Sequence, residues 1–288
     1  MKHRMIIIEG IPGSGKSTCA KRVEEYLTKK GIKAKLYNEG EAHPVDMAWN
    51  AYLTLDEYEA LLSKYPEYSD VIKKHTQFEA EYVTIAYTKL GFYPNQNELM
   101  DYLEAHEVYD GRVDLATFEK LHLKRWSSFH LKDDEAVIFE CAYLQNQVGE
   151  LMQTHNQSKD HIYAYLLEIL KGIAKYQPLI IYLTQKNVEE TITRVAKERV
   201  STDQSKWEDW IDLVTRLIEN SLYGKVHDLK GLEGTMQFFK DRKQVELEFL
   251  NQISTQYPKL ASVKILANDD YNWEQLENKL KEIINQEY

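Results

Sequence analysis

One stretch of eight residues near the N-terminus constrains the fold more than any other feature of the chain. Residues 10–17 read Gly-Ile-Pro-Gly-Ser-Gly-Lys-Ser and match the pattern G-x-x-x-x-G-K-[ST] without a gap. The run Arg4–Glu9 before it is typical of a short buried strand, and residues 18–29 after it are typical of a helix. A phosphate-binding loop needs this strand–loop–helix setting, because backbone N–H groups and the positive end of a helix must face one anion.

The residue types in the loop agree with this interpretation. Glycines carry no Cβ that would block the turn or the close approach of a phosphate. Lys16 would reach the β- and γ-phosphates, and the hydroxyl of Ser17 would bind Mg²⁺. The motif therefore predicts binding of a nucleoside triphosphate, and we take ATP with Mg²⁺ as the cofactor pair. The residues expected to bind it are Gly10, Gly13, Ser14, Gly15, Lys16, Ser17 and Thr18.

Composition limits the remaining classes of protein. The chain has 288 residues with a formal net charge of −10, which disfavours non-specific binding to nucleic acid. Its two cysteines cannot build a disulfide framework, so a reducing cytoplasm is the natural location. No apolar stretch approaches the length of a membrane span, and no membrane association is expected. The sequence leaves the oligomeric state open, a homodimer included.

Apolar runs that alternate with helical stretches predict an α/β fold with helices on both faces of a parallel sheet. The five expected strands are Met5–Ile8, Ala34–Tyr37, Ala136–Phe139, Leu179–Leu183 and Val263–Leu266. We expect one three-layer domain over residues 1–288. Residues 47–132, between the second and third strands, read as a large helical insertion that begins with a capping box at Thr54 and Glu57. Residues 186–204 read as a lid-like segment.

Polar residues follow two of the expected strands at their carboxyl ends, where open α/β sheets bind ligands. Glu140 ends the third strand and is the candidate second group that positions Mg²⁺, although a surface glutamate at a strand end would look the same. Glu39, Glu41 and His43 follow the second strand. A carboxylate there could take a proton from an attacking hydroxyl or hold the acceptor, and Glu41 is the candidate catalytic one. Ordinary loop acids remain an equal alternative.

Cations follow the fourth strand and recur in the insertion. Arg194, Lys197 and Arg199 lie on a short stretch that could close over a transferring phosphoryl group and neutralise its charge. The alternative is a solvated basic helix end, which the helix dipole favours in any case. Arg125, beside Trp126, is a weaker candidate for binding the acceptor.

These motifs together resemble the P-loop nucleoside and nucleotide kinases, above all the thymidylate kinases and the deoxynucleoside kinases. The resemblance covers about half of the chain. It rests on four segments in order, Ile7–Thr18, Glu39–Asn50, Pro178–Arg199 and Val263–Ile284. It implies a P-loop kinase fold with an arginine-bearing lid, and a last strand followed by a loop against which adenine rests. The chain departs from these families in two places: Glu140-Cys141-Ala142 replaces an acid followed by arginine, and His43 replaces a glutamate before proline.

The leading functional hypothesis is ATP- and Mg²⁺-dependent phosphoryl transfer to a small acceptor, a nucleoside or a nucleotide. Lys16, Arg194 and Arg199 would stabilise charge, and Glu41 or Glu39 would orient the acceptor. Two alternatives stay open. One is a nucleotide-dependent switch or hydrolase without an acceptor, although the guanine signature N-K-x-D is absent. The other is a kinase of a non-nucleotide metabolite.

Overall fold

The computed structural model describes residues 4–39, 43–92, 97–132, 134–204 and 207–287. The chain divides into two compact units, the first formed by Met1–Asn38 with Trp126–Tyr288 and the second by Glu39–Arg125. The units are described separately below. Among the described residues, no helix is both long and apolar enough to cross a lipid bilayer.

A five-stranded parallel sheet organises the first unit. In spatial order its strands are β2 (Lys33–Tyr37), β6 (Glu135–Glu140), β1 (Met5–Gly10), β7 (Leu179–Thr184) and β8 (Ser262–Ala267). Each of the five predicted strands falls within one of these, so the predicted α/β fold with a five-stranded parallel sheet is confirmed. The central strands form because their side chains are almost all apolar, which suits a strand buried on both faces.

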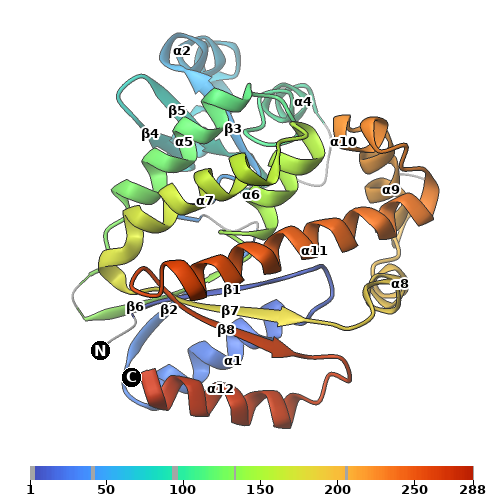
Figure 1. Ribbon diagram of the computed structural model, residues 1–288. Helices are drawn as coiled ribbons and strands as arrows, with labels where there is room; N and C mark the ends of the chain where they lie inside the picture. Colours follow the sequence, from blue (N-terminus) through green and yellow to red (C-terminus); the bar gives the residue numbers. More distant parts are fainter. Residues whose placement is uncertain (1–3, 40–42, 93–96, 133, 205–206, 288) are drawn as a thin grey trace. The chain divides into compact units, whose positions relative to one another are not determined.

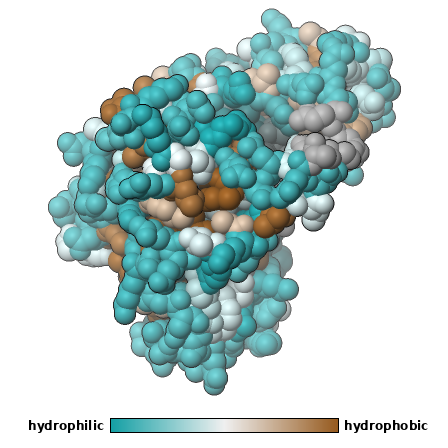
Figure 2. Space-filling model, turned by 90° about the vertical axis from the view of Figure 1, so that its right-hand side faces the viewer, coloured by the Kyte–Doolittle hydropathy of each residue, from teal (hydrophilic) through white to brown (hydrophobic). Residues whose placement is uncertain are grey.

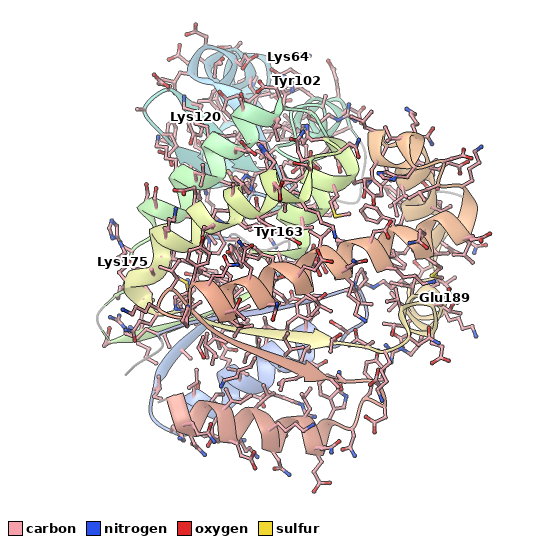
Figure 3. All side chains as sticks on the ribbon, in the orientation of Figure 1. Lys64, Tyr102, Lys120, Tyr163, Lys175 and Glu189 are labelled. Carbon is pink, nitrogen blue, oxygen red and sulfur yellow. The ribbon has the colours of Figure 1, made fainter. Side chains whose placement is uncertain are left out.

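Helices cover both faces of this sheet (Figure 1). On one face lie α1 (Lys16–Lys29) and α12 (Trp273–Glu287), which pack against each other. On the other face lie α6 (Gln145–Gly149), α7 (Lys159–Ile173) and α11 (Gly231–Gln256). Tyr163, labelled in Figure 3, joins two of these helices, because its hydroxyl donates to the carbonyl of Val245 at 3.2 Å. The three-layer arrangement places the end of β1, and thus the phosphate loop, at the carboxyl edge of the sheet.

The remaining helices of the first unit follow β7. They are α8 (Val188–Glu198), α9 (Trp210–Asn220) and α10 (Leu222–Val226). Figure 2 shows the side of the molecule on which they lie, with apolar side chains gathered among hydrophilic ones. The short turns η3 (Glu150–Thr154) and η4 (Ala174–Tyr176) complete the unit.

The second unit contains strands as well as helices, so the expectation of a helical insertion over residues 47–132 is corrected. Its strands β3 (Asn50–Thr54), β5 (Tyr82–Ala86) and β4 (Thr76–Phe78) form an antiparallel sheet in that order. The helical elements are α2 (Leu55–Lys64), η1 (Pro66–Tyr68), α3 (Ser69–Lys74), η2 (Tyr87–Lys89), α4 (Glu98–Glu104) and α5 (Leu115–Ser128), which continues into the first unit.

The sequence predicted one feature of this unit correctly and did not reveal another. The predicted capping box is confirmed, because Thr54 and Glu57 bond each other's backbone N–H groups and start α2. The sequence pattern did not reveal these strands because they have only three to five residues, too few for a periodicity to be recognised. Apolar side chains from this sheet and from α2 and α4 form a core of the unit's own.

Candidate functional site

The phosphate loop has a backbone that only glycine suits at two of its positions. Gly13 has a φ of 77° and Gly15 a φ of 93°, in the left-handed region that other residues rarely adopt. A Cβ on Gly13 would lie 2.0 Å from Cγ2 of Val195, and one on Gly15 would lie 2.6 Å from the ring of Trp273. The loop is therefore tightly enclosed by α8 on one side and by the start of α12 on the other.

Side chains from distant segments hold the outer carbonyl groups of the loop. The carbonyl of Gly13 accepts hydrogen bonds from Nη2 of Arg194 at 2.8 Å and from the hydroxyl of Tyr271 at 2.9 Å. The carbonyl of Ser14 accepts one from the amide of Asn268 at 2.8 Å. Because α1 begins at Lys16, the first N–H groups of that helix have no acceptor within it. The loop thus presents fixed N–H groups and the positive end of a helix, which suits a polyphosphate.

Lys16 is almost completely buried, and its ammonium group donates to the carbonyl of Ile11 at 2.9 Å. The lysine therefore lies along the loop itself, close to the place where the motif requires a cation. Ser17 and Thr18 are exposed on the first turn of α1, whereas Ser14 is completely buried. Gly10 connects β1 to the loop and has a φ of 147°.

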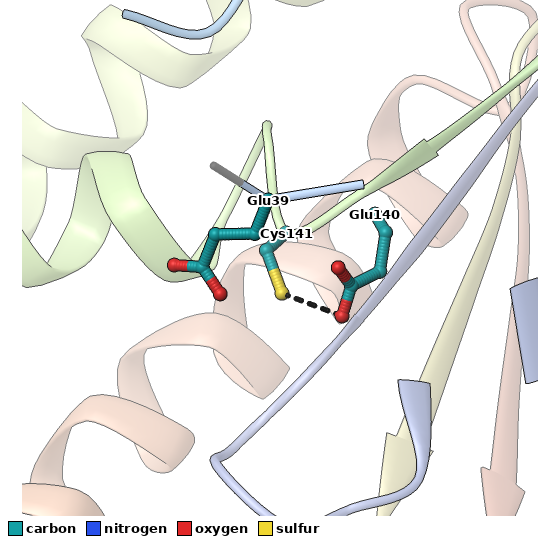
Figure 4. A group of neighbouring side chains, drawn as sticks. All are labelled: Glu39, Glu140 and Cys141. Atoms are coloured by element: carbon teal, nitrogen blue, oxygen red, sulfur yellow. Dashed lines mark hydrogen bonds between the residues drawn. The ribbon is translucent and has the colours of Figure 1, made fainter. Parts of the chain in front are cut away.

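Ser17 and Glu140 form the pair of oxygen ligands that Mg²⁺ would need. The hydroxyl of Ser17 donates to Oε1 of Glu140 at 2.9 Å, and the thiol of Cys141 donates to the same oxygen at 3.2 Å (Figure 4). Strands β1 and β6 are neighbours in the sheet, which brings the end of β6 beside the loop. A hydroxyl and a carboxylate oxygen are hard ligands of the kind Mg²⁺ prefers, so these residues fit the ion. The sequence predicted both members of this pair.

The two candidate arginines after β7 occupy different surroundings. Arg194 reaches the loop, and its guanidinium carbon lies 3.4 Å from the centre of the Tyr271 ring. Arg199 ends α8, is exposed, and lies over the ring of Trp210 at 5.3 Å. Among the contacts that the structure describes, none joins Arg199 to the phosphate loop. The structure therefore brings together Arg194, Lys16, Ser17 and Glu140.

The other expected acceptor-side residues belong to the second unit. His43 is buried, and its Nδ1 accepts the backbone N–H groups of Val45 at 3.2 Å and Asp46 at 2.9 Å. Burial, with a smaller effect from the charge of Arg125, lowers the pKa of His43 to about 3, so its imidazole is neutral. Glu39 is exposed at the start of the unit. Glu41 lies outside the described residues.

Arg125 is also mostly buried, and its contacts are internal to the second unit. Its guanidinium donates to Oγ1 of Thr84 at 2.8 Å and to Oε1 of Gln77. Both partners lie on the antiparallel sheet, on β5 and β4. These bonds satisfy only part of the buried guanidinium, because its Nε has no hydrogen-bond partner, and the role of Arg125 toward an acceptor stays a prediction.

The arrangement at the carboxyl edge of the parallel sheet decides the class of fold. The chain has a P-loop NTPase fold. A family model described as "Chromatin associated protein KTI12" matches residues 4–63. A structure of thymidylate kinase from Candida albicans is similar at 14% identity and a TM-score of 0.44, over 99% of this chain and 92% of that chain. No curated protein matches the sequence.

Sequence reasoning missed the residues that hold the loop from outside. Asn268 and Tyr271 follow β8, in a stretch that reads Asn-Asp-Asp-Tyr-Asn-Trp over residues 268–273. The available signal was a polar and aromatic cluster directly after a strand, at the same edge of the sheet as the phosphate loop. For this segment the resemblance to kinases implied only a loop against which adenine rests, with no role for Asn268 or Tyr271.

The sequence also did not reveal a row of buried, hydrogen-bonded side chains in the second unit. The hydroxyl of Tyr109 donates to Oδ1 of Asp46 at 2.7 Å and lies 3.0 Å from Nε2 of His122. His122 is completely buried, and burial lowers its pKa to about 3. Tyr109 is 63 positions from Asp46 and 13 from His122 in the sequence, so no local spacing reveals these contacts.

Proposed function

We propose that this protein is a phosphotransferase that moves the γ-phosphoryl group of ATP to a small acceptor, a nucleoside or a nucleotide, with Mg²⁺ as cofactor. The hydrogen bond of 2.9 Å between Ser17 and Glu140 carries the proposal, because it places a hydroxyl and a carboxylate beside the loop motif that binds phosphates. Bound there, Mg²⁺ would neutralise charge on the β- and γ-phosphates.

The residues of this chain then bind and stabilise the transferring group. The ammonium of Lys16 leaves the carbonyl of Ile11 and donates to the phosphate oxygens, which are stronger acceptors because they are charged. Arg194 is tied to the loop through Gly13, so it needs little movement to donate to a phosphoryl group on that loop. Catalysis of this kind consists of positioning and charge stabilisation.

The acceptor side rests on the sequence alone. We propose that Glu39 or Glu41 orients the hydroxyl or phosphate that is attacked, because both follow β2 at the carboxyl edge of the sheet. Residues 186–204 would close over the reacting groups, with Arg199 as a second cation. We also propose that this phosphoryl transfer takes place in a reducing cytoplasm.

A second function is favoured by one observation. The model that matches residues 4–63 describes a chromatin-associated protein, which suggests a nucleotide-dependent binding or switch protein without a small acceptor. The same loop and the same Ser17–Glu140 pair would then bind and slowly hydrolyse the nucleotide.

The experiment that separates these functions measures ATP consumption with Mg²⁺ across nucleosides, nucleoside monophosphates and small metabolites. Lys16→Ala removes the phosphate-binding cation, and Lys21→Ala is the matched control, since Lys21 is an exposed lysine of the same helix. Turnover that an acceptor stimulates and that only Lys16→Ala abolishes supports the kinase. Slow hydrolysis without stimulation favours the switch. Full turnover in Lys16→Ala contradicts both proposals.

A further inference from the structure

Glu9 is a completely buried carboxylate that the proposed mechanism does not use. It lies on β1 directly before Gly10, the first residue of the phosphate loop. Its Oε1 accepts the backbone N–H groups of Tyr143 at 2.8 Å and Leu144 at 3.0 Å, and its Oε2 accepts that of Gln145 at 3.0 Å. Three hydrogen bonds from backbone N–H groups to its carboxyl oxygens tie residues 143–145 to β1 and offset part of the cost of burying this group.

These three residues form the outgoing side of a sharp turn at the end of β6. The turn itself lies at Cys141, whose φ of 65° is left-handed although the residue is not a glycine. Such a conformation costs on the order of 1–2 kcal/mol and persists only where neighbouring groups hold it. On the incoming side, the N–H of Cys141 donates to the carbonyl of Ile8 at 3.1 Å. On the outgoing side, the holding group is Glu9.

The turn carries the candidate metal ligand. Glu140 immediately precedes Cys141, and its Oε1 lies 2.9 Å from the hydroxyl of Ser17. A metal ligand has to be held to within about 0.5 Å of its productive position. The thiol of Cys141 donates to the same Oε1 at 3.2 Å, so a relaxed backbone at Cys141 would move one of the two groups that hold this carboxylate oxygen.

We infer that Glu9 is a positioning residue for Glu140. Its buried carboxylate holds the backbone of residues 143–145, and this fixes the strained turn whose thiol, from Cys141, holds Oε1 of Glu140 beside Ser17. The inference rests on the proposed function, because only that function gives Glu140 a metal to hold. It adds that the strand which leads into the phosphate loop also sets the geometry of the metal ligand.

If Glu9 had a purely structural role, its loss would have the same effect as the loss of another buried carboxylate. The chain offers such a carboxylate as a control. Glu246 on α11 is also completely buried, and its Oε1 lies 3.1 Å from Nε of Arg242. Its Oε2 accepts the hydroxyl of Tyr182 at 2.5 Å. Glu246→Gln therefore neutralises a buried carboxylate of the same unit that makes none of the described hydrogen bonds to the turn, although it also removes a charge that raises the pKa of Glu9.

The test uses the full-length protein and its variants Glu9→Gln, Glu246→Gln and Glu140→Gln. Binding of Mn²⁺ in the presence of ATP is measured by electron paramagnetic resonance, and binding of ATP with excess chelator is measured by calorimetry. We expect Glu9→Gln to weaken Mn²⁺ binding about tenfold, the usual effect of losing a group that orients a metal ligand. ATP affinity without metal stays within about twofold, because the loop N–H groups are intact. Glu246→Gln changes neither affinity, and Glu140→Gln weakens Mn²⁺ binding more than Glu9→Gln does.

The outcomes separate the inference from the proposed function. If Glu140→Gln loses Mn²⁺ affinity while Glu9→Gln binds Mn²⁺ like the wild type, the inference is overturned and the function stands. If Glu140→Gln itself binds Mn²⁺ normally, the metal role of Glu140 fails and the inference falls with it. Should Glu9→Gln not fold, Glu9→Asp replaces it. That variant keeps the charge but withdraws the carboxylate by one methylene, and we expect the same loss of Mn²⁺ affinity.

Discussion

The two compact units differ in what their buried polar side chains contact. In the first unit, buried side chains such as Lys16 and Asn268 donate to backbone carbonyls of the phosphate loop. In the second unit, several buried side chains bond to other side chains, as Arg125 does to Thr84 and Tyr109 to Asp46.

This difference indicates which unit is built to bind a ligand. Side chains that hold the outside of a loop keep its N–H groups fixed and available, which is the preorganisation a phosphate site needs. Hydrogen bonds between buried side chains help to specify a unique core. In the second unit this network is incomplete, because Nε of Arg125 is buried without a hydrogen-bond partner.

The largest predicted effect is on ATP binding, and it follows from replacing one glycine by alanine in each unit. Gly13→Ala in the loop places a Cβ 2.0 Å from Val195, whereas Gly91→Ala in the second unit meets nothing within 4 Å. Both positions have a positive φ, 77° and 85°, so backbone strain is matched. We expect Gly13→Ala to weaken ATP binding at least about 100-fold, or about 2.7 kcal/mol, and Gly91→Ala to leave it unchanged. Calorimetric titration with ATP checks this.

The double variant Gly13→Ala with Val195→Ala serves as the control, since it removes the methyl group that the new Cβ would strike. We expect it to recover part of the affinity, with the strain of the positive φ remaining. Equal affinities for Gly13→Ala and the wild type would show that the enclosure of the loop has no role in binding.

The next largest predicted effect is on kcat, and it differs between two arginines of the first unit. Arg194→Ala removes a cation that already contacts the loop, and Arg199→Ala removes one that lies over Trp210. Loss of a positioned donor to a developing charge typically lowers kcat about 100-fold, so we expect that effect for Arg194→Ala. We expect Arg199→Ala to lower kcat less, and to lower kcat more than ATP affinity. Steady-state kinetics with the acceptor found in the screen measures both, and a reversed order would mean that the lid rearranges before transfer.

The fold of the first unit could be predicted from the sequence better than that of the second, because its signals are local. The central strands β1, β6 and β7 are continuous apolar runs, because both of their faces are buried, and such runs are visible without any tertiary information. The loop motif is local as well, so Lys16, Ser17 and the nearby Glu140 could be named from spacing and strand ends. Both signals act over a few residues.

What the sequence could not show depends on contacts between distant residues. Strand β4 is only three residues long, Thr-Gln-Phe, and its pairing with β5 decides that it is a strand. Tyr271 reaches Gly13 across 258 positions, and Glu9 reaches Tyr143 across 134. His43 and Arg125 read as polar residues that are ready to bind an acceptor, yet the fold buries both of them. Burial of a polar residue is a property of the folded chain, so the sequence alone could not predict it.

A smaller effect is an opposite response of the two units to pH. In the second unit, burial lowers the pKa of His43 and His122 to about 3 and raises that of Glu107 to about 8. In the first unit, burial raises the pKa of Glu9 to about 7 against the opposing effect of its hydrogen bonds. A histidine with a lowered pKa contributes stability above pH 6.5 that is lost as the pH falls toward 3. A glutamate with a raised pKa contributes stability at low pH that is lost as the pH rises from 4.5 toward its folded value.

Between pH 4.5 and 6.5, therefore, two histidines make the second unit more stable as the pH rises, and one glutamate makes it less stable. In the first unit, Glu9 makes the unit less stable as the pH rises. We expect the free energy of opening to rise with pH in the second unit by up to about 1.4 kcal/mol per pH unit, and to fall in the first. Hydrogen exchange of amides in β5 and β1, corrected for the intrinsic pH dependence of exchange, measures each slope. His122→Gln should remove the rise, and parallel slopes in the two units would contradict the assignment.

The smallest effect concerns the second donor to the carbonyl of Gly13. Tyr271→Phe removes a hydroxyl that donates at 2.9 Å but keeps the ring against which Arg194 lies. A neutral hydrogen bond contributes about 1 kcal/mol, and Arg194 still donates to the same carbonyl, so we expect ATP affinity to fall no more than about fivefold. Tyr271→Ala removes the ring as well and should also lower kcat, because Arg194 loses the surface that orients it. Equal kcat values for the Phe and Ala variants would show that Arg194 is positioned by the loop alone. A lower kcat in the Ala variant would show that the segment after β8 positions the arginine through the ring of Tyr271.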